Sequence, residues 1–244
     1  MVIPLKRAEL IEDLKSKILH LHTFNQLNNK VLNRNLGSIV HAFPNSSFPL
    51  GAIHEFVSDR TEDIAATSGF VAGILSSLMG GSGKALWISA KRKLFPPALT
   101  SFGLSPDRFI FIDLAKEKDV LWAMDEALKC GALSVVVGEM QEISFTGSRR
   151  LQLAVEKSQV TGFLLRSNFK NINPTACVSR WKITSIPSEQ IDNLPGIGFP
   201  KWRVELTRVR NGKAGSWDLA WINGRFAPIY KFQPDIEELQ RRAG

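Results

Sequence analysis

The strongest constraint on the fold is a regular alternation of short, continuously apolar segments with longer amphipathic ones. The apolar segments have the length of strands, and turn-forming residues bound them. We predict strands over residues 52–57, 85–89, 108–113, 133–137 and 161–166, and helices over 61–79, 96–103, 117–130 and 149–157. Strands that are apolar on both faces and alternate with helices form parallel sheets with crossover helices. The predicted fold is therefore an α/β protein with a mostly parallel sheet.

A predicted helix precedes this α/β core, which we expect to span residues 45–188. Residues 4–22 repeat apolar side chains at three- and four-residue steps, which is typical of an amphipathic helix. The Asn-rich sequence that follows predicts a linker or exposed turn, so residues 1–44 form an N-terminal helix and linker. Two interpretations of the helix stay open: it caps the core, or it is an arm that binds a partner.

A predicted hairpin follows the core. A strand with basic residues at alternate positions is expected over residues 179–183, and a Pro- and Gly-rich turn comes after it. Residues 203–210 and 216–222 alternate in polarity on either side of an Asn-Gly turn, which predicts a β-hairpin. Residues 189–244 therefore form a basic hairpin with a polar C-terminal tail.

The composition is that of a globular protein, since 44% of the 244 residues are hydrophobic and 22% are charged. No run approaches the roughly 18 apolar residues of a membrane helix, and the first 20 residues are too charged for a signal peptide. Cys130 and Cys177 make no disulfide framework, and with four histidines they make no metal spacing. Both cysteines are interpreted as buried small hydrophobes. We expect a cytoplasmic, nucleoid-associated protein that uses no cofactor and contacts no membrane.

The positive charge is concentrated in the last part of the chain. The net charge is +8, yet residues 1–148 carry 15 basic and 15 acidic residues, while residues 149–244 carry 16 and 8. A neutral body with a basic last third is typical of a protein that binds a polyanion, because Lys and Arg displace counterions from phosphates. The alternative interpretation is a solvated surface that confers only solubility.

A nucleotide site is expected after the first strand of such a sheet, but the residues there do not fit one. A phosphate loop needs glycines that wrap the phosphates, then Lys and a hydroxyl. The turn at residues 57–64 has no glycine or lysine and carries Asp59, Glu62 and Asp63. The Gly-Lys pair that ends the run 80–84 precedes a predicted strand instead of a helix. We therefore predict a degenerate phosphate loop and no catalytic activity.

The predicted fourth strand also lacks the aspartate that a nucleotide hydrolase uses to hold magnesium. Glycine, at position 138, stands where that aspartate is expected. Glu139 and Glu142 follow and could hold a metal, although lone carboxylates at a strand end are more often solvated. No Ser, His and Asp arrangement is recognisable elsewhere in the sequence.

A series of short segments, in order, resembles the ImuA family. The segments are FPLGAIHEF at 48–56, ALWIS at 85–89, FPPAL at 95–99, GLSPDR at 103–108, VLWAMDEALKCGA at 120–132 and SRRLQLA at 148–154. Residues 125–138 are also similar to the RecA segment that leads to its metal-binding aspartate. The resemblance implies a RecA-like, P-loop NTPase-like fold and an accessory role in SOS-induced translesion synthesis, mutagenesis and DNA repair. The implied partners are an inactive Y-family polymerase relative (ImuB-like), an error-prone C-family polymerase, RecA and DNA.

The resemblance also suggests where DNA would bind, because loops after the fourth and fifth strands line the DNA path in RecA-like folds. These loops are residues 138–149 and 167–179. The candidate phosphate-binding residues are Arg149, Arg150, Arg166, Lys170, Arg180 and Lys182, with Arg208, Arg210 and Lys213 on the hairpin. Phe145 and Phe169 could stack on bases, or they could pack in the core. Two other functions stay open: a RecA-like DNA-dependent ATPase, and a cell-division inhibitor similar to SulA, a more distant relative.

Overall fold

The structure is a computed structural model that describes residues 28–90, 93–167, 172–188 and 198–229. The predicted helix at 4–22 and the C-terminal tail lie outside these residues. The strands are β1 (Ile53–Ser58), β2 (Ala85–Ser89), β3 (Phe109–Asp113), β4 (Val135–Met140), β5 (Thr161–Ser167), β6 (Ser179–Ile186), β7 (Lys201–Val209), β8 (Gly215–Ile222) and β9 (Arg225–Pro228). The α-helices are α2 (Thr61–Met79), α3 (Glu117–Leu128) and α4 (Phe145–Ser158), and the 3-10 helices are η1 (Gly37–Ala42), η2 (Pro44–Ser46), η3 (Pro96–Phe102) and η4 (Pro106–Arg108).

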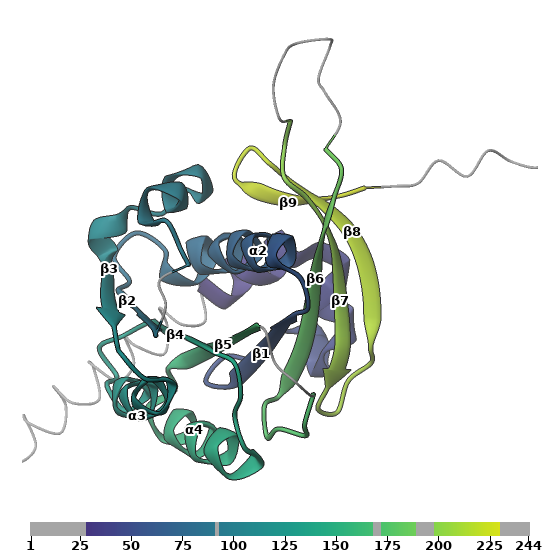
Figure 1. Ribbon diagram of the computed structural model, residues 1–244. Coiled ribbons are helices and arrows are strands. Elements are labelled where there is room, and N and C mark those ends of the chain that lie inside the picture. Colours follow the sequence, from purple (N-terminus) through teal and green to yellow (C-terminus); the bar gives the residue numbers. More distant parts are fainter. Residues whose placement is uncertain (1–27, 91–92, 168–171, 189–197, 230–244) are drawn as a thin grey trace, which may run out of the picture.

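The described strands form one sheet in the order β3-β2-β4-β5-β1-β6-β7-β8-β9. Neighbouring strands from β3 to β6 are parallel, and β7, β8 and β9 continue the sheet in antiparallel fashion. Helix α2 covers one face, whereas α3 and α4 lie on the other (Figure 1). The prediction of a helix-flanked, mostly parallel sheet is confirmed, as is the hairpin, which β7 and β8 form.

Two apolar layers hold the helices to the sheet. The layer under α2 is rich in aromatic rings, among them Phe56, Phe70 and Trp181, whose centroids lie 5.8 to 6.4 Å apart. The layer under α3 and α4 is mainly aliphatic. Because both faces are covered, every residue of β1 is buried, which explains why its sequence shows no alternation. No helix among the described residues could cross a membrane.

Three differences from the predicted elements affect the candidate sites or the core. The Asn-rich segment predicted as a linker is helical over residues 28–36, where Leu32 and Leu36 are buried. Strand β4 runs to Met140, so Gly138 and Glu139 lie inside the strand instead of following it. Helix α4 begins at Phe145, four residues before its predicted start, because the side chain of Ser144 caps it by accepting a hydrogen bond from the Gly147 amide at 3.0 Å.

Candidate nucleic-acid interface

The turn after β1 occupies the position of a phosphate loop, and its charged side chains form ion pairs within the turn and with β6. Arg60 Nε lies 3.0 Å from Asp63 Oδ2, and Arg60 Nη1 lies 3.1 Å from Glu62 Oε1. Lys182 Nζ, from β6, pairs with Asp59. These pairs place three carboxylates around the N-terminus of α2. They give that terminus acidic side chains in place of a phosphate.

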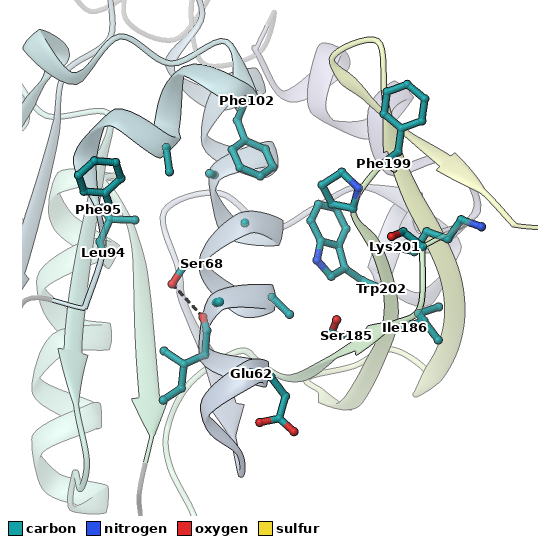
Figure 2. A pocket seen from close by; sticks show the side chains of 18 of the residues that line it. Glu62, Ser68, Leu94, Phe95, Phe102, Ser185, Ile186, Phe199, Lys201 and Trp202 are labelled. Carbon is teal, nitrogen blue, oxygen red and sulfur yellow. Dashed lines mark hydrogen bonds between the residues drawn. The ribbon is translucent and has the colours of Figure 1, made fainter. Parts of the chain in front are cut away.

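Beside the first half of α2 lies a mostly apolar cavity of about 920 Å³ (Figure 2). The ring of Phe95 stands on one wall and that of Phe199 on the other, and both are exposed. Ser68 lines its floor and donates a hydrogen bond to the Ile64 carbonyl at 2.9 Å. The cavity therefore offers mainly apolar contacts and few polar groups that could bind or react with a ligand.

Glu139 is one of two candidate metal ligands, and its surroundings do not favour metal binding. Its Oε1 accepts a hydrogen bond from Trp87 Nε1 at 2.7 Å, and burial raises its pKa. Glu142 is exposed. Within the described ranges, no group of three or more His, Cys, Asp or Glu side chains could hold a metal ion.

A pocket of about 390 Å³ lies where the start of α4, the segment before β6 and the end of β7 meet. We call it the basic pocket, because three arginines line it. Phe145 and Arg149 line it from α4, Arg208 and Arg210 line it from β7 and the turn after it, and residues 175–177 line it from the segment between them. Arg149 and Arg210 are exposed, and Phe145 is 56% exposed. The pocket thus combines guanidinium groups with one accessible aromatic ring.

Backbone carbonyls hold two of these arginines in place. Arg208 Nη2 donates to the carbonyl oxygens of Thr175 and Cys177, each at 2.9 Å, and Arg210 Nη2 donates to that of Ala176 at 3.0 Å. Among the residues that the structure describes, no carboxylate forms an ion pair with Arg149, Arg208 or Arg210. The charges of Arg208 and Arg210 are therefore held in position, and all three guanidinium groups are available to an anion.

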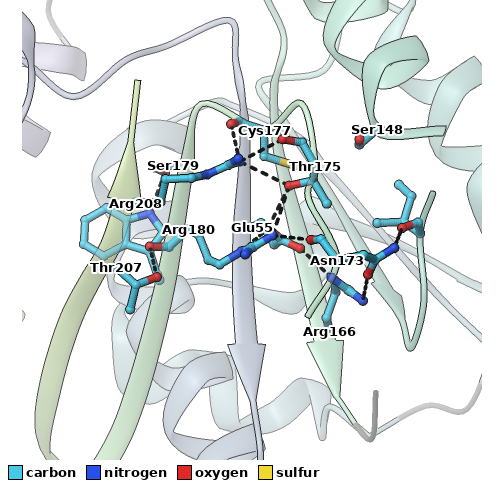
Figure 3. A network of polar contacts seen from close by, with 12 residues as sticks. Glu55, Ser148, Arg166, Asn173, Thr175, Cys177, Ser179, Arg180, Thr207 and Arg208 are labelled. Atoms are coloured by element: carbon cyan, nitrogen blue, oxygen red, sulfur yellow. Dashed lines mark hydrogen bonds and ion pairs between the residues drawn. The ribbon is translucent and has the colours of Figure 1, made fainter. Parts of the chain in front are cut away.

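A buried network around Glu55 positions the segment that carries those carbonyls (Figure 3). Arg166 Nη1 lies 2.7 Å from Glu55 Oε1, and Arg180 Nε lies 2.7 Å from Oε2. Thr175 Oγ1 donates to the same Oε2 at 2.9 Å, and Arg180 Nη2 donates to the Asn173 carbonyl at 2.7 Å. The single carboxylate of Glu55 thus pairs with two guanidinium groups, and the network holds the segment before β6 beneath the basic pocket.

The structure brings only part of the predicted DNA-binding set together. Phe145, Arg149, Arg208 and Arg210 share the basic pocket. Arg166 is fully buried and Arg180 nearly so, and both hold the Glu55 network instead of facing solvent. The prediction of a surface role for these two is therefore corrected to a supporting one, because their guanidinium groups are needed by Glu55.

The other candidates lie apart from the basic pocket. Arg150 points to α3, with its Nη2 3.3 Å from Asp125 Oδ2, and Lys182 pairs with Asp59. Lys213 is exposed in the turn after β7. Lys170 and Phe169 lie outside the described residues.

Sequence reasoning missed Glu55 and misjudged one cysteine. A charged residue inside a continuously apolar strand was the available signal, because a buried carboxylate needs partners. The backbone carbonyls of residues 175–177 carry no such signal, since every residue has a backbone carbonyl. Cys177 is buried as predicted, and burial raises the pKa of its thiol to about 12. Cys130 is exposed, which contradicts the prediction.

Comparisons with known proteins point to two related groups. The family model of the cell division inhibitor SulA matches residues 51–162. Protein ImuA of Caulobacter vibrioides is 34% identical over 194 residues, which cover 75% of this chain and 80% of that protein. The cell division inhibitor SulA of Erwinia pyrifoliae is 30% identical over 151 residues, or 62% of this chain and 89% of that protein. The likeness to ImuA is longer and stronger, and the chain belongs to the ImuA family.

Proposed function

We propose that this protein is a non-catalytic, RecA-like accessory factor of SOS-induced translesion DNA synthesis, and that it contacts DNA through the basic pocket. Membership of the ImuA family supports the cellular role. The parallel order β3-β2-β4-β5-β1 and the turn after β1, in the position of a phosphate loop, support the RecA-like fold. The observation that carries the DNA contact is the set of arginines around the basic pocket that pair with no carboxylate in the described part of the chain.

The DNA contact is tested by titrating a labelled 30-nucleotide strand at several salt concentrations. For a single strand, each phosphate contact makes the slope of the logarithm of the binding constant against the logarithm of the salt concentration steeper by about 0.7. Arg149→Gln combined with Arg210→Gln is expected to weaken binding and to reduce the slope by about 1.4. Arg208 is unsuited to this test because it also holds the carbonyls of Thr175 and Cys177.

The neighbouring residue on α4 supplies the matched control. Arg150→Gln removes the same charge one position away, but Arg150 faces Asp125 on α3. This variant is expected to keep the wild-type salt slope. A flat slope in the wild-type protein, or equal binding by the Arg149→Gln, Arg210→Gln double variant, would refute DNA contact at the basic pocket.

The proposed partners are an inactive Y-family polymerase relative and an error-prone C-family polymerase, with RecA as a further candidate. The support for them is the family relationship. Pull-down of the purified Y-family relative by the full chain, with and without nuclease, tests this part of the proposal. Binding that survives nuclease indicates a protein contact, whereas binding that is lost shows that DNA bridges the two proteins.

A second candidate function is inhibition of cell division, which the SulA family match over residues 51–162 favours. Expression of the chain in a bacterial host would then produce filamentous cells in the absence of DNA damage. Normal cell length at high expression would eliminate this candidate.

A further inference from the structure

We propose that the basic pocket receives one unpaired base of a single strand, which stacks on Phe145 while the flanking phosphates lie on Arg149 and Arg210. This inference rests on the DNA contact proposed above and specifies its ligand. Its starting point is the ring of Phe145, a large apolar side chain that is 56% exposed at the wall of a cavity. Stacking on a base would cover that ring, and aromatic side chains bind every base through its π-face.

The position of Phe145 connects the ring to the charges. Phe145 is the first residue of α4, and Arg149 lies one turn further along the same helix. Residues four apart on a helix share one face, so the ring and this guanidinium face the same cavity. Arg210 lies on the side of the pocket that the turn after β7 supplies. A strand in which phosphates flank each flat base offers partners for both the ring and the guanidinium groups of this pocket.

The fixed arginines favour a nucleic acid strand over an acidic peptide. The carbonyls of residues 175–177 are occupied by Arg208 and Arg210, so the floor presents guanidinium groups instead of acceptors for a peptide backbone. A peptide carboxylate would satisfy the arginines, but it would bring no ring to Phe145. The volume of about 390 Å³ is also within the range of about 300–1,000 Å³ that small-ligand pockets occupy.

A duplex does not fit the same pocket. Its bases are stacked on one another and paired, so neither base face is free to meet Phe145. Extruding a base from a duplex costs a few kcal/mol, and an already single-stranded base avoids that cost. We therefore expect the single strand to be the preferred ligand when the probes are compared at equal phosphate concentration.

The experiment compares four fluorescent or competing probes on the full chain: a 15-nucleotide oligothymidylate, a duplex of equal length, a 15-unit abasic phosphodiester and polyaspartate. Phe145→Leu removes the ring from an exposed position, and Phe145→Tyr retains it. Phe145→Leu is expected to weaken oligothymidylate binding by about 5- to 150-fold. The same variant should leave abasic binding and the salt slope unchanged, and Phe145→Tyr should bind as the wild type does.

The outcomes separate this inference from the proposal beneath it. If the wild-type chain binds none of the nucleic acid probes, the DNA contact itself fails. If it binds single strand and duplex alike, and Phe145→Leu has no selective effect, the stacked base is refuted while the DNA contact stands. Polyaspartate that displaces oligothymidylate at equal charge concentration would assign the basic pocket to an acidic protein instead.

Discussion

His54 is a buried histidine, and both of its ring hydrogen bonds are compatible with the neutral form that burial favours. Its Nε2 donates to the Pro49 carbonyl at 2.8 Å, and its Nδ1 lies 2.7 Å from the Ser179 hydroxyl, which also accepts from Trp181 Nε1. A neutral ring that donates from Nε2 accepts at Nδ1, so the Ser179 hydroxyl donates to Nδ1. Burial is the main reason why the pKa of His54 falls to about 4. A protonated ring would place an uncompensated positive charge in the core.

This histidine makes the stability of the protein depend on pH. Its pKa is about 4 when folded and 6.5 when unfolded, so the unfolded chain binds the extra proton between these values. Stability from this residue is complete above pH 6.5 and is lost as the pH falls towards 4, by roughly 3 kcal/mol. Urea unfolding across this range is expected to show the loss. His54→Gln should reduce the dependence, and the same change at exposed His41 should retain it. Equal pH profiles for both variants would contradict the assignment.

Glu55 neutralises buried charge beneath the basic pocket, so its removal is expected to be costly. Glu55→Gln removes the carboxylate that pairs with both Arg166, which is fully buried, and Arg180. Breaking a buried ion pair by removing one partner costs about 3–5 kcal/mol in the free energy of unfolding. Glu62→Gln is the matched control, because Glu62 and its partner Arg60 are both more than half exposed and the change should cost under about 1 kcal/mol. Similar urea midpoints for the two variants would show that the network is not stabilising.

Helix α2 illustrates how packing between elements depends on a single missing side chain. A Cβ atom at Gly73 would lie 2.6 Å from Phe226 Cζ and 2.9 Å from Trp221 Cζ3. The glycine therefore allows β8 and β9 to approach the helix. This close packing offsets the low helix propensity of glycine, which is unfavourable inside a helix by roughly 1 kcal/mol relative to alanine.

Filling that space is expected to displace the C-terminal strands. Gly73→Val should destabilise the protein by about 1–3 kcal/mol through overpacking. Gly81→Ala, at a glycine whose Cβ would meet nothing within 4 Å, is the control and should leave stability nearly unchanged. Adding Phe226→Leu to Gly73→Val should recover part of the loss, and thermal unfolding measures all three. No loss in Gly73→Val would show that β9 does not depend on this approach.

Most strands and helices could be predicted because both faces of the sheet are covered, which leaves apolar runs of strand length in the sequence. The Asn-rich helix could not, because its asparagines serve tertiary contacts. Asn33 Oδ1 accepts from the Phe48 amide at 2.9 Å, and Asn35 Nδ2 donates to Ser77 Oγ at 2.7 Å. Composition alone does not distinguish such residues from those of an exposed turn.

The sequence predicted that arginines in the last part of the chain would form a basic surface, but not which of them line the basic pocket. Arg149, Arg208 and Arg210 followed from the excess of basic residues after position 148, whereas the buried roles of Arg166 and Arg180 depend on Glu55 across 111 and 125 positions. Sequence spacing carries no information on pairs so far apart. The division of the chain at residues 44 and 188 stays a prediction.

The protein as a whole combines a mostly parallel sheet with a turn after β1 that has no glycine or lysine. Ligands of parallel sheets bind at the carboxyl ends of the strands, next to helix N-termini. Here the N-terminus of α2 carries Glu62 and Asp63, and Asp63 also accepts from the Ser185 amide at 3.4 Å, so its carboxylate is held in the turn. A triphosphate would meet these carboxylates before it reached the helix amides.

We therefore expect 1 mM magnesium ATP to leave the melting temperature unchanged and no ATP turnover to occur, with or without DNA. A ligand present at 100 times its dissociation constant stabilises a protein by about 2.7 kcal/mol, which for a chain of this size raises the melting temperature by roughly 5–10 °C. Differential scanning fluorimetry detects a shift of that size, and a coupled assay measures turnover. The Lys84→Ala variant is the control, because Lys84 follows the glycine-rich turn at 80–83 and is the other residue considered for phosphate binding. Magnesium-dependent turnover that Lys84→Ala abolishes would identify the chain as an ATPase, whereas a shift in melting temperature without turnover would mean that the sheet still holds a nucleotide as a structural ligand.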